Sequence, residues 1–186
     1  ADTIYFGGGT PSYYGERRLR EILSLLQRLC TVSRQAEITV ECNPDSVRRK
    51  ELRMLRKEGV NRLSIGAQSA NDDILRLIGR RHNWRQVEMA VKRARKAGFR
   101  NVSLDLIYGL PSQTREDWAD TLTKALALKP AHISCYGLRL EEGTPMYDEY
   151  EGTDILPSDD DQADMYLYAV DFLSRHGFRQ YEISNF

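Results

Sequence analysis

An internal repeat with a period of about 40 residues restricts the fold of this chain more than any other feature. Residues 56–66 align with residues 95–105, and residues 175–183 form a looser third copy. Each copy contains a basic final helical turn, a glycine suited to a helix C-terminus and a short β-rich run. The glycines are 39 and 79 residues apart, so one unit is missing between the second and third copies. Residues 129–136 supply that unit, with Pro130 in place of glycine as the helix stop.

Alternation of helix and strand at this period predicts an α/β fold with parallel strands. Six near-continuous apolar runs are typical of strands that are buried on both faces: residues 4–6, 38–40, 63–65, 102–107, 133–138 and 181–183. Helices fill the intervals, in the order β-α-β-α-β-α-α-β-α-β-α-β. No stretch is rich enough in Gly, Pro or Ser to divide the chain, so we expect one domain over residues 1–186.

The predicted helices show apolar stripes and start signals. Thr114 and Asp117 predict a capping box, and Ser158 followed by three aspartates predicts a second N-terminal cap. The first helix has a stripe at helical spacing that we expect to be its buried face: Leu19, Ile22, Leu23, Leu26 and Leu29.

The composition is that of a soluble globular protein, because 41% of the residues are hydrophobic and 29% are charged. No stretch approaches the roughly 20 apolar residues of a membrane helix, and no signal peptide opens the chain. The formal net charge is zero, which removes a global attraction to nucleic acid or to anionic membranes. Residues 1–140 nevertheless hold 25 Lys/Arg against 15 Asp/Glu, while residues 141–164 hold ten acids and no base. Solvated helix faces and an acidic surface loop explain this better than an acidic docking segment.

The cysteines and histidines are scattered along the chain. Cys30, Cys42 and Cys135 have no CxxC spacing, which indicates neither a disulfide framework nor a zinc site and fits a reducing, cytoplasmic compartment. The histidines show no metal-binding spacing and are expected to be surface or packing residues: His82, His132 and His176. No catalytic triad or paired-carboxylate spacing is present, so we assign neither catalytic residues nor metal ligands.

Glycines follow the first predicted strand at its carboxyl end, which is where parallel α/β proteins bind ligands. Gly7, Gly8 and Gly9 match neither the dinucleotide-binding fingerprint nor the phosphate-binding P-loop. The triplet is equally compatible with a tight strand–helix turn and with a cradle of bare N–H groups for a polar ligand.

Polar residues end the next strands or lie within them. Glu41 follows the second strand, Gln68 the third, and Asp105 lies between apolar neighbours in the fourth. A carboxylate in an apolar run needs a partner. That partner is either an arginine such as Arg80 or Arg62, in a structural salt bridge, or the ammonium group or ribose of a ligand. Arg80 belongs to a basic cluster and contributes to a site only if it turns inward. Together these residues suit a small zwitterionic ligand that carries a ribose.

Five motifs then occur in one order: FGGGTPS at 6–12, ECNP at 41–44, NRLSIGAQS at 61–69, DLIYGLP at 105–111 and QT at 113–114. Together they resemble the radical S-adenosylmethionine enzymes of the oxygen-independent coproporphyrinogen III oxidase family, over nearly the whole chain. Three further stretches resemble the haem-chaperone branch of that family rather than the true oxidases: GRRH at 79–82, GTPMY at 143–147 and QYEISNF at 180–186.

The resemblance implies an incomplete (βα)6 TIM-like barrel that holds S-adenosylmethionine at its mouth. It implies that the methionine amino and carboxylate groups of this cofactor are bound by Gly8, Gly9 and Thr10. It also implies that the remaining polar groups and the ribose are contacted by Glu41, Gln68, Arg80 and Asp105.

One departure from the family is large. The family holds a [4Fe–4S] cluster with a CxxxCxxC loop after its first strand, and the three cysteines of this chain cannot replace that loop at their spacing. We expect the motif just upstream of Ala1, so that the chain is truncated there and lacks the first, cluster-bearing strand. The C-terminal region of the family, which follows residue 186, is expected to be absent as well. By itself the chain is expected to bind no cluster, to perform no radical chemistry and to expose a sheet edge.

Three functions remain open. The first is the core of a haem chaperone, which holds haem and passes it to an acceptor protein, with the cluster and S-adenosylmethionine in the parent protein. The second is an oxygen-independent coproporphyrinogen III oxidase, which decarboxylates propionates by radical chemistry. The third does not depend on the resemblance: a phosphate-binding parallel α/β enzyme that uses the glycine triplet as an anion cradle.

Overall fold

A computed structural model describes the backbone of residues 1–186 and the side chains of residues 1–15 and 17–186. Two compact units make up the chain. Unit 1 contains residues 1–66 and 85–104, and unit 2 contains residues 67–84 and 105–186.

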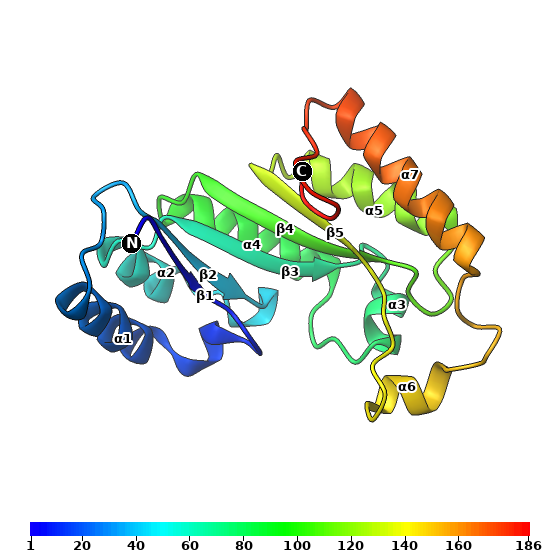
Figure 1. Ribbon diagram of the computed structural model, residues 1–186, viewed down its shortest axis with the longest axis horizontal. Helices are drawn as coiled ribbons and strands as arrows, with labels where there is room; N and C mark the ends of the chain where they lie inside the picture. The colour runs from blue at the N-terminus through cyan, green and yellow to red at the C-terminus, as the bar shows by residue number, and fades with distance from the viewer. The chain divides into compact units, whose positions relative to one another are not determined.

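A five-stranded sheet with the strand order β1-β2-β3-β4-β5 confirms the predicted α/β class (Figure 1). Its strands are β1 (Thr3–Phe6), β2 (Glu37–Cys42), β3 (Arg62–Gln68), β4 (Asn101–Tyr108) and β5 (His132–Gly137). The first three pair in parallel, with Ile4 opposite Ile38 and Val40 opposite Leu63. Because β1 is the first strand in this order, it forms an edge of the sheet, and its Tyr5 is 56% exposed.

The helices of unit 1 are α1 (Glu16–Leu29), α2 (Arg49–Lys57) and nearly all of α4 (Trp84–Lys96), with short 3₁₀ turns at Pro11–Tyr14 and Pro44–Ser46. The apolar face of α4 is buried through Val87, Ala90 and Ala94. The prediction for α1 is only half right. Leu19 and Leu23 are buried, but Ile22 is 46% exposed and Leu29 is 73% exposed.

Unit 2 contains the helices α3 (Asp72–Leu77), α5 (Arg115–Ala127), α6 (Pro145–Tyr150) and α7 (Asp159–Arg175). Helices α5 and α7 pack against each other (Figure 1). Both predicted caps are confirmed. Thr114 and Asp117 form a complete capping box on α5, and the side chain of Ser158 accepts a hydrogen bond from the N–H of Asp161. Helix α6 was not predicted.

The repeat has a common backbone basis. Gly59, Gly98 and Gly177 follow α2, α4 and α7 with φ angles of 105°, 98° and 85°, the left-handed conformation that glycine adopts without a Cβ penalty. In the remaining copy of the repeat, at residues 129–136, Lys129 takes this conformation, with φ 51°, immediately before Pro130.

The predicted sixth strand at residues 181–183 is wrong. Tyr181 and Ile183 are 65% and 74% exposed, and the only bridge to β5 in this segment is an isolated antiparallel one between Asn185 and Ser134. The physical reason is local. The Glu182 carboxylate accepts hydrogen bonds from the Ser184 N–H and from the Asn185 side chain, so the segment closes into a turn.

Within the part of the chain that the structure describes, every helix is too short or too polar to span a membrane.

Candidate functional site

In unit 1 the turn after β1 is closed by the carboxylate of Glu41. Oε1 of Glu41 accepts a hydrogen bond from the Tyr5 hydroxyl at 2.8 Å, and Oε2 accepts one from the Gly8 N–H at 3.1 Å. A Cβ on Gly7 would lie 2.7 Å from the Tyr5 ring and 3.0 Å from the Glu41 carboxylate, so any other residue there would displace these two side chains. The predicted residues Gly8 and Glu41 are therefore in contact. Tyr5, which orients the carboxylate, was missed, although its position in β1 just before the glycines was a usable signal.

The backbone conformation of Gly8 and Gly9 favours glycine at these positions, although a side chain would have room there. Their φ angles are 81° and 60°, and nothing lies within 4 Å of where a Cβ would stand. The turn therefore presents its backbone to open space, which is what a ligand that approaches the main chain requires.

The salt-bridge alternative for Glu41 is not realised. The ion pair on β2 joins Arg62 to Glu37, at 3.8 Å and at the other end of the strand. Among the described residues, Glu41 forms no ion pair, so its negative charge is balanced only by the hydroxyl and the N–H that it accepts.

Thr10 begins the 3₁₀ turn beside this carboxylate turn, and its hydroxyl accepts a long hydrogen bond of 3.5 Å from Asn43. Nearby, the Tyr13 hydroxyl donates to Oδ2 of Asp45 at 2.7 Å. Oδ1 of Asp45 is buried and has no hydrogen-bond partner among the described residues. A buried acceptor of this kind is costly unless a donor reaches it, so this corner of unit 1 has capacity for one more donor group.

In unit 2, Gln68 ends β3 with a backbone conformation that is uncommon for a non-glycine residue. Its φ angle is 67° and its side chain is buried, with 7% of the residue exposed. The carbonyl of the preceding Ala67 accepts a hydrogen bond from Nε2 of the buried His82 at 3.2 Å. His82 is therefore a structural residue that fixes the end of β3, as the packing interpretation of the histidines predicts.

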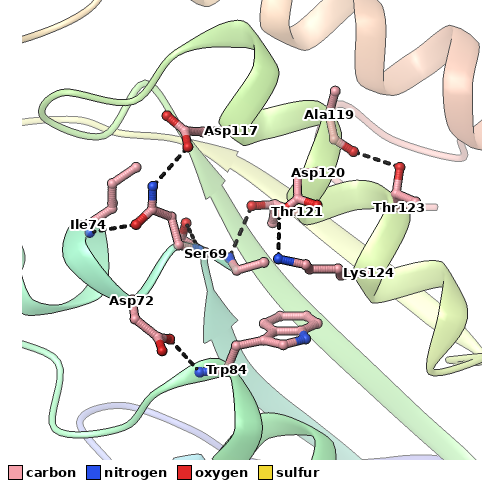
Figure 2. Close-up of polar contacts among 12 residues, drawn as sticks. Ser69, Asp72, Ile74, Trp84, Asp117, Ala119, Asp120, Thr121, Thr123 and Lys124 are labelled. Atoms are coloured by element: carbon pink, nitrogen blue, oxygen red, sulfur yellow. Dashed lines mark hydrogen bonds and ion pairs between the residues drawn. The ribbon is translucent and has the colours of Figure 1, made fainter.

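The loop after Gln68 is anchored to the first two turns of α5 (Figure 2). The Ala70 N–H donates to the buried hydroxyl of Thr121 at 3.0 Å, and Nδ2 of Asn71 donates to Asp117 at 2.8 Å. Oδ1 of Asn71 also caps α3 by accepting from the N–H groups of Asp73 and Ile74. These contacts hold the segment that leads to Arg80. The sequence signal was an Asn followed by two aspartates, which is typical of a helix start.

The pKa of Asp117 in this anchor is lowered. Burial by itself raises that pKa, but the hydrogen bonds that the carboxylate accepts from Thr114 and Asn71 outweigh burial. The charged form of Asp117 is therefore the form that stabilises unit 2.

Arg80 and Asp105, the other predicted residues of unit 2, are both half-buried. Arg80 is therefore not the fully solvated side chain that a surface basic cluster would give. Asp105 lies in the middle of β4, and its charge raises the pKa of the Cys135 thiol, which burial already raises. Burial also raises the pKa of Tyr108 at the end of β4, and charge interactions with Tyr166 and Cys135 raise it further.

The cysteines do not fit an iron–sulfur cluster. Cys30 is exposed at the end of α1, while Cys42 and Cys135 are buried in β2 and β5. Among the residues whose side chains are described, no group of three His, Cys, Asp or Glu side chains could hold a metal ion.

A cavity of about 880 Å³ lies in unit 2 between the start of α5, residues 151–158 and the start of α7. It is lined by Gln113 and Arg115 and by several acids, among them Glu151 and Asp161, and by none of the predicted residues. Arg115 is already paired with Asp161 and Asp164 at 2.8 and 2.6 Å, and it is the one base against four acids in the lining, so the cavity is acidic.

Comparison with known proteins gives a consistent result. The model of the Radical SAM superfamily matches residues 1–125. A Lactococcus lactis protein named Heme chaperone HemW is 42% identical over 185 residues, which are 99% of this chain and 49% of that protein. The HemW of Bacillus subtilis is 40% identical over 186 residues, with the same coverage of 99% and 49%. The chain thus spans about half the length of the curated relatives it matches. Coproporphyrinogen III oxidase (HemN) from Escherichia coli has a structure that matches 100% of this chain and 43% of its own, with a TM-score of 0.89 and 30% identity.

Proposed function

This chain belongs to the radical SAM superfamily, and from that membership we propose that residues 1–186 form the S-adenosylmethionine-binding core of a haem chaperone. In the parent protein, the core binds S-adenosylmethionine together with a [4Fe–4S] cluster and supports the transfer of haem to an acceptor protein. The exposed thiol of Cys30 favours a reducing compartment such as the cytoplasm.

The observation that carries this proposal is the identity of about 40% to proteins named as haem chaperones, over 99% of the chain. The alignment with these proteins also covers nearly all of residues 126–186, beyond the part that the superfamily model matches. The branch-specific stretches at 143–147 and 180–186 fall in this part.

The proposed cofactor site starts from the turn after β1. Gly8, Gly9 and Thr10 bind the methionine end of S-adenosylmethionine, and Glu41 accepts hydrogen bonds from its ammonium group. The predicted residues Gln68, Arg80 and Asp105 lie in unit 2, and their part in binding this cofactor stays a prediction from the resemblance. Two features support the part in unit 1: the open space beside Gly8 and Gly9, and a Glu41 carboxylate without an ion pair. When bound with its cluster, the cofactor supplies radical chemistry.

The same carboxylate argues against the phosphate-binding alternative. An anion cradle needs N–H groups directed at the ligand and no negative charge beside them. Here the Gly8 N–H already donates to Glu41, so a phosphate would approach a carboxylate. An ammonium group gains from the same arrangement.

A coproporphyrinogen III oxidase is the second candidate. The observation that favours it is the match of the whole chain to the Escherichia coli oxidase, at a TM-score of 0.89. The two functions require different ligands, because a haem chaperone binds the iron porphyrin, whereas an oxidase binds a metal-free tetracarboxylate.

Titration of the 186-residue chain separates the two functions. Hemin and coproporphyrin III are added in parallel, and binding is followed by absorbance and by quenching of the tryptophan fluorescence. The proposal expects one hemin per chain, at least tenfold tighter than coproporphyrin III, and release of this hemin to apomyoglobin. A preference for coproporphyrin III would contradict the chaperone and favour the oxidase, and binding of neither would contradict both.

A further inference from the structure

A second cavity, of about 550 Å³, lies in unit 1 at the amino end of β2, whereas Glu41 lies near the other end of that strand. It is lined by Gln27 in the last turn of α1, by Arg56 in the last turn of α2 and by Arg34 in the loop between α1 and β2. Helices α1 and α2 pack against each other, which brings their final turns together (Figure 1). The volume is within the range of pockets that bind small molecules.

The buried part of the lining is apolar and firmly held. Ala36 and Ile38 are 5% and 4% exposed. Asn61 fixes both, because its Oδ1 accepts from the Ile38 N–H at 2.9 Å and its Nδ2 donates to the Ala36 carbonyl at 2.8 Å. The loop before β2 is tied to the start of β1, since the Ser33 N–H donates to the Ala1 carbonyl at 2.9 Å. The cavity is therefore formed before any ligand binds.

The helix ends at this cavity are compatible with an anion, although the C-terminus of a helix carries a partial negative charge. The Val60 N–H donates to the Leu55 carbonyl at 3.1 Å with Gly59 in the left-handed conformation, so a Schellman motif satisfies the last carbonyls of α2. Basic side chains in the final turns, Arg28 on α1 and Lys57 on α2, offset the helix dipoles further.

The guanidinium group of Arg56 is held in place by backbone contacts. Its Nε donates to the Gly98 carbonyl and its Nη1 to the Val60 carbonyl, both at 3.4 Å. It also lies 6.0 Å from the centre of the Phe99 ring, within the range of a cation–π contact. Nη2 makes no hydrogen bond among the described residues, so an oriented donor remains for a ligand.

The positive charges of this cavity have no acidic partner within it. Its lining contains Arg34 and Arg56 but no Asp or Glu. Neither arginine forms an ion pair with another residue that the structure describes, and Glu37, which begins β2, is paired with Arg62 at 3.8 Å. Two uncompensated guanidinium groups on one small cavity are suited to an anion with several acceptor oxygens.

We propose that this cavity binds a small molecule that carries a phosphomonoester group, with Arg34 and Arg56 as the cationic donors. A phosphomonoester carries a charge of about −1.5 to −2 at pH 7, which two arginines balance, and the guanidinium fork matches its oxygens. The amide of Gln27 supplies a further donor, and Ala36 and Ile38 contact the organic part of the ligand.

This inference goes beyond the proposed function and does not depend on it. The glycine turn after β1 is unsuited to phosphate because the Glu41 carboxylate already accepts from the Gly8 N–H. At the other end of β2 the cavity has the opposite character, with cations and no acid in its lining. The two ends of one strand are therefore expected to bind different ligands.

The test is an NMR titration of the ¹⁵N-labelled 186-residue chain with phenyl phosphate, which joins the dianion to an apolar ring. The amide signals of Ser33, Arg34 and Gly59 should shift, while those of Gly8 and Gly9 should not. Benzoate has the ring but a single negative charge, and it should bind about tenfold more weakly. Equal affinities for the two probes would overturn the assignment to phosphate, and absence of phenyl phosphate binding would overturn the site.

Arg34→Gln is the main variant, because this exposed side chain makes no contact that the fold requires. It should weaken phenyl phosphate binding about tenfold, as the loss of a charge-assisted hydrogen bond implies. Arg28→Gln is the matched control: it removes the same charge from the last turn of α1 but lies outside the lining, so its affinity should stay within about twofold. Equal losses in both variants would show that only the net positive charge of unit 1 attracts phosphate, which overturns the inference.

Arg56→Lys is the second variant, because it keeps the charge and removes the guanidinium fork. It should also weaken phenyl phosphate binding, and far-UV circular dichroism checks that loss of the Gly98 contact leaves the fold intact. S-adenosylmethionine and hemin titrations of Arg34→Gln should match those of the unmodified chain. A loss of either ligand in this variant would contradict a separate site, whereas failure of phosphate binding alone leaves the proposed function standing.

Discussion

Glu41→Gln tests the proposed cofactor site without changing its shape. The side-chain oxygen of Gln can keep the hydrogen bond from the Gly8 N–H, and the Tyr5 hydroxyl can rotate to accept from the new amide group. The turn after β1 is therefore retained, and the substitution removes mainly the negative charge. Glu41 has no ion pair among the described residues, so no cation is left behind unpaired.

The expected magnitude follows from the lost contact with the ammonium group of S-adenosylmethionine. A hydrogen bond between charged groups contributes about 1.5–3 kcal/mol, and each 1.4 kcal/mol is about tenfold in affinity. Glu41→Gln should therefore weaken S-adenosylmethionine binding roughly 10- to 150-fold. Methylthioadenosine has the adenosyl group and the sulfur but no ammonium group, so its affinity should stay within about twofold of the unmodified chain.

Isothermal titration calorimetry of both ligands measures this difference. Glu37→Gln is the matched control, because Glu37 lies on the same strand but is paired with Arg62 at its other end, so this variant should bind both ligands normally. Equal S-adenosylmethionine affinities for Glu41→Gln and the unmodified chain would refute the assignment. An equal loss for both ligands would show that Glu41 acts by shaping the turn and not by its charge.

Three further predictions concern stability and are checked by chemical or thermal unfolding. Thr121→Val leaves the buried N–H of Ala70 without an acceptor and should lower the free energy of unfolding by about 1–3 kcal/mol, whereas an unchanged value would mean that water replaces the hydroxyl. The pKa of Asp117 is lower in the folded chain than in the unfolded chain, where it is near 4, so the charged carboxylate stabilises the fold above that pH and this stability is lost as the pH falls through the folded pKa. Asp117→Asn should therefore reduce the fall of the melting temperature at acid pH. Equal dependence of the melting temperature on pH in the variant and the unmodified chain would contradict this. Lys129→Gly places glycine at a position with a left-handed backbone, where the repeat has Gly98. The variant should raise the free energy of unfolding by up to about 1 kcal/mol, because glycine takes this conformation without strain. A decrease would show that the Lys129 side chain stabilises the fold by more than the backbone strain costs.

The features predicted correctly are those that short stretches of sequence determine. A cap needs only a hydroxyl or carboxylate and the N–H groups of the next turn, so Thr114 and Ser158 could be identified without the rest of the fold. The left-handed glycines after α2, α4 and α7 are similar, because the φ angle is a property of one residue. Local signals of this kind gave the order of helices and strands through α7, apart from α6.

The features that were missed depend on which segments meet in space. The run at 181–183 has strand-like composition, but hydrogen bonds to Glu182 close it into a turn. The stripe on α1 has helical spacing throughout, yet burial of Leu29 requires a neighbour that spacing does not specify. Likewise, the glycine triplet could be a turn or a cradle until Glu41 was placed against Gly8.

The net charge of zero is the sum of opposite net charges on the two units, and these charges affect how each proposed ligand binds. Unit 1 holds 18 Lys/Arg against 9 Asp/Glu, a net charge of +9, and unit 2 holds 9 against 18, a net charge of −9. The carboxylate of S-adenosylmethionine is therefore favoured by unit 1 as a whole, and only its ammonium group needs a dedicated acid, which is the role proposed for Glu41. Haem propionates meet the opposite situation in unit 2, where general attraction is absent. A haem site in unit 2 would have to offset this repulsion with a local cation, whereas unit 1 attracts propionates and the S-adenosylmethionine carboxylate alike.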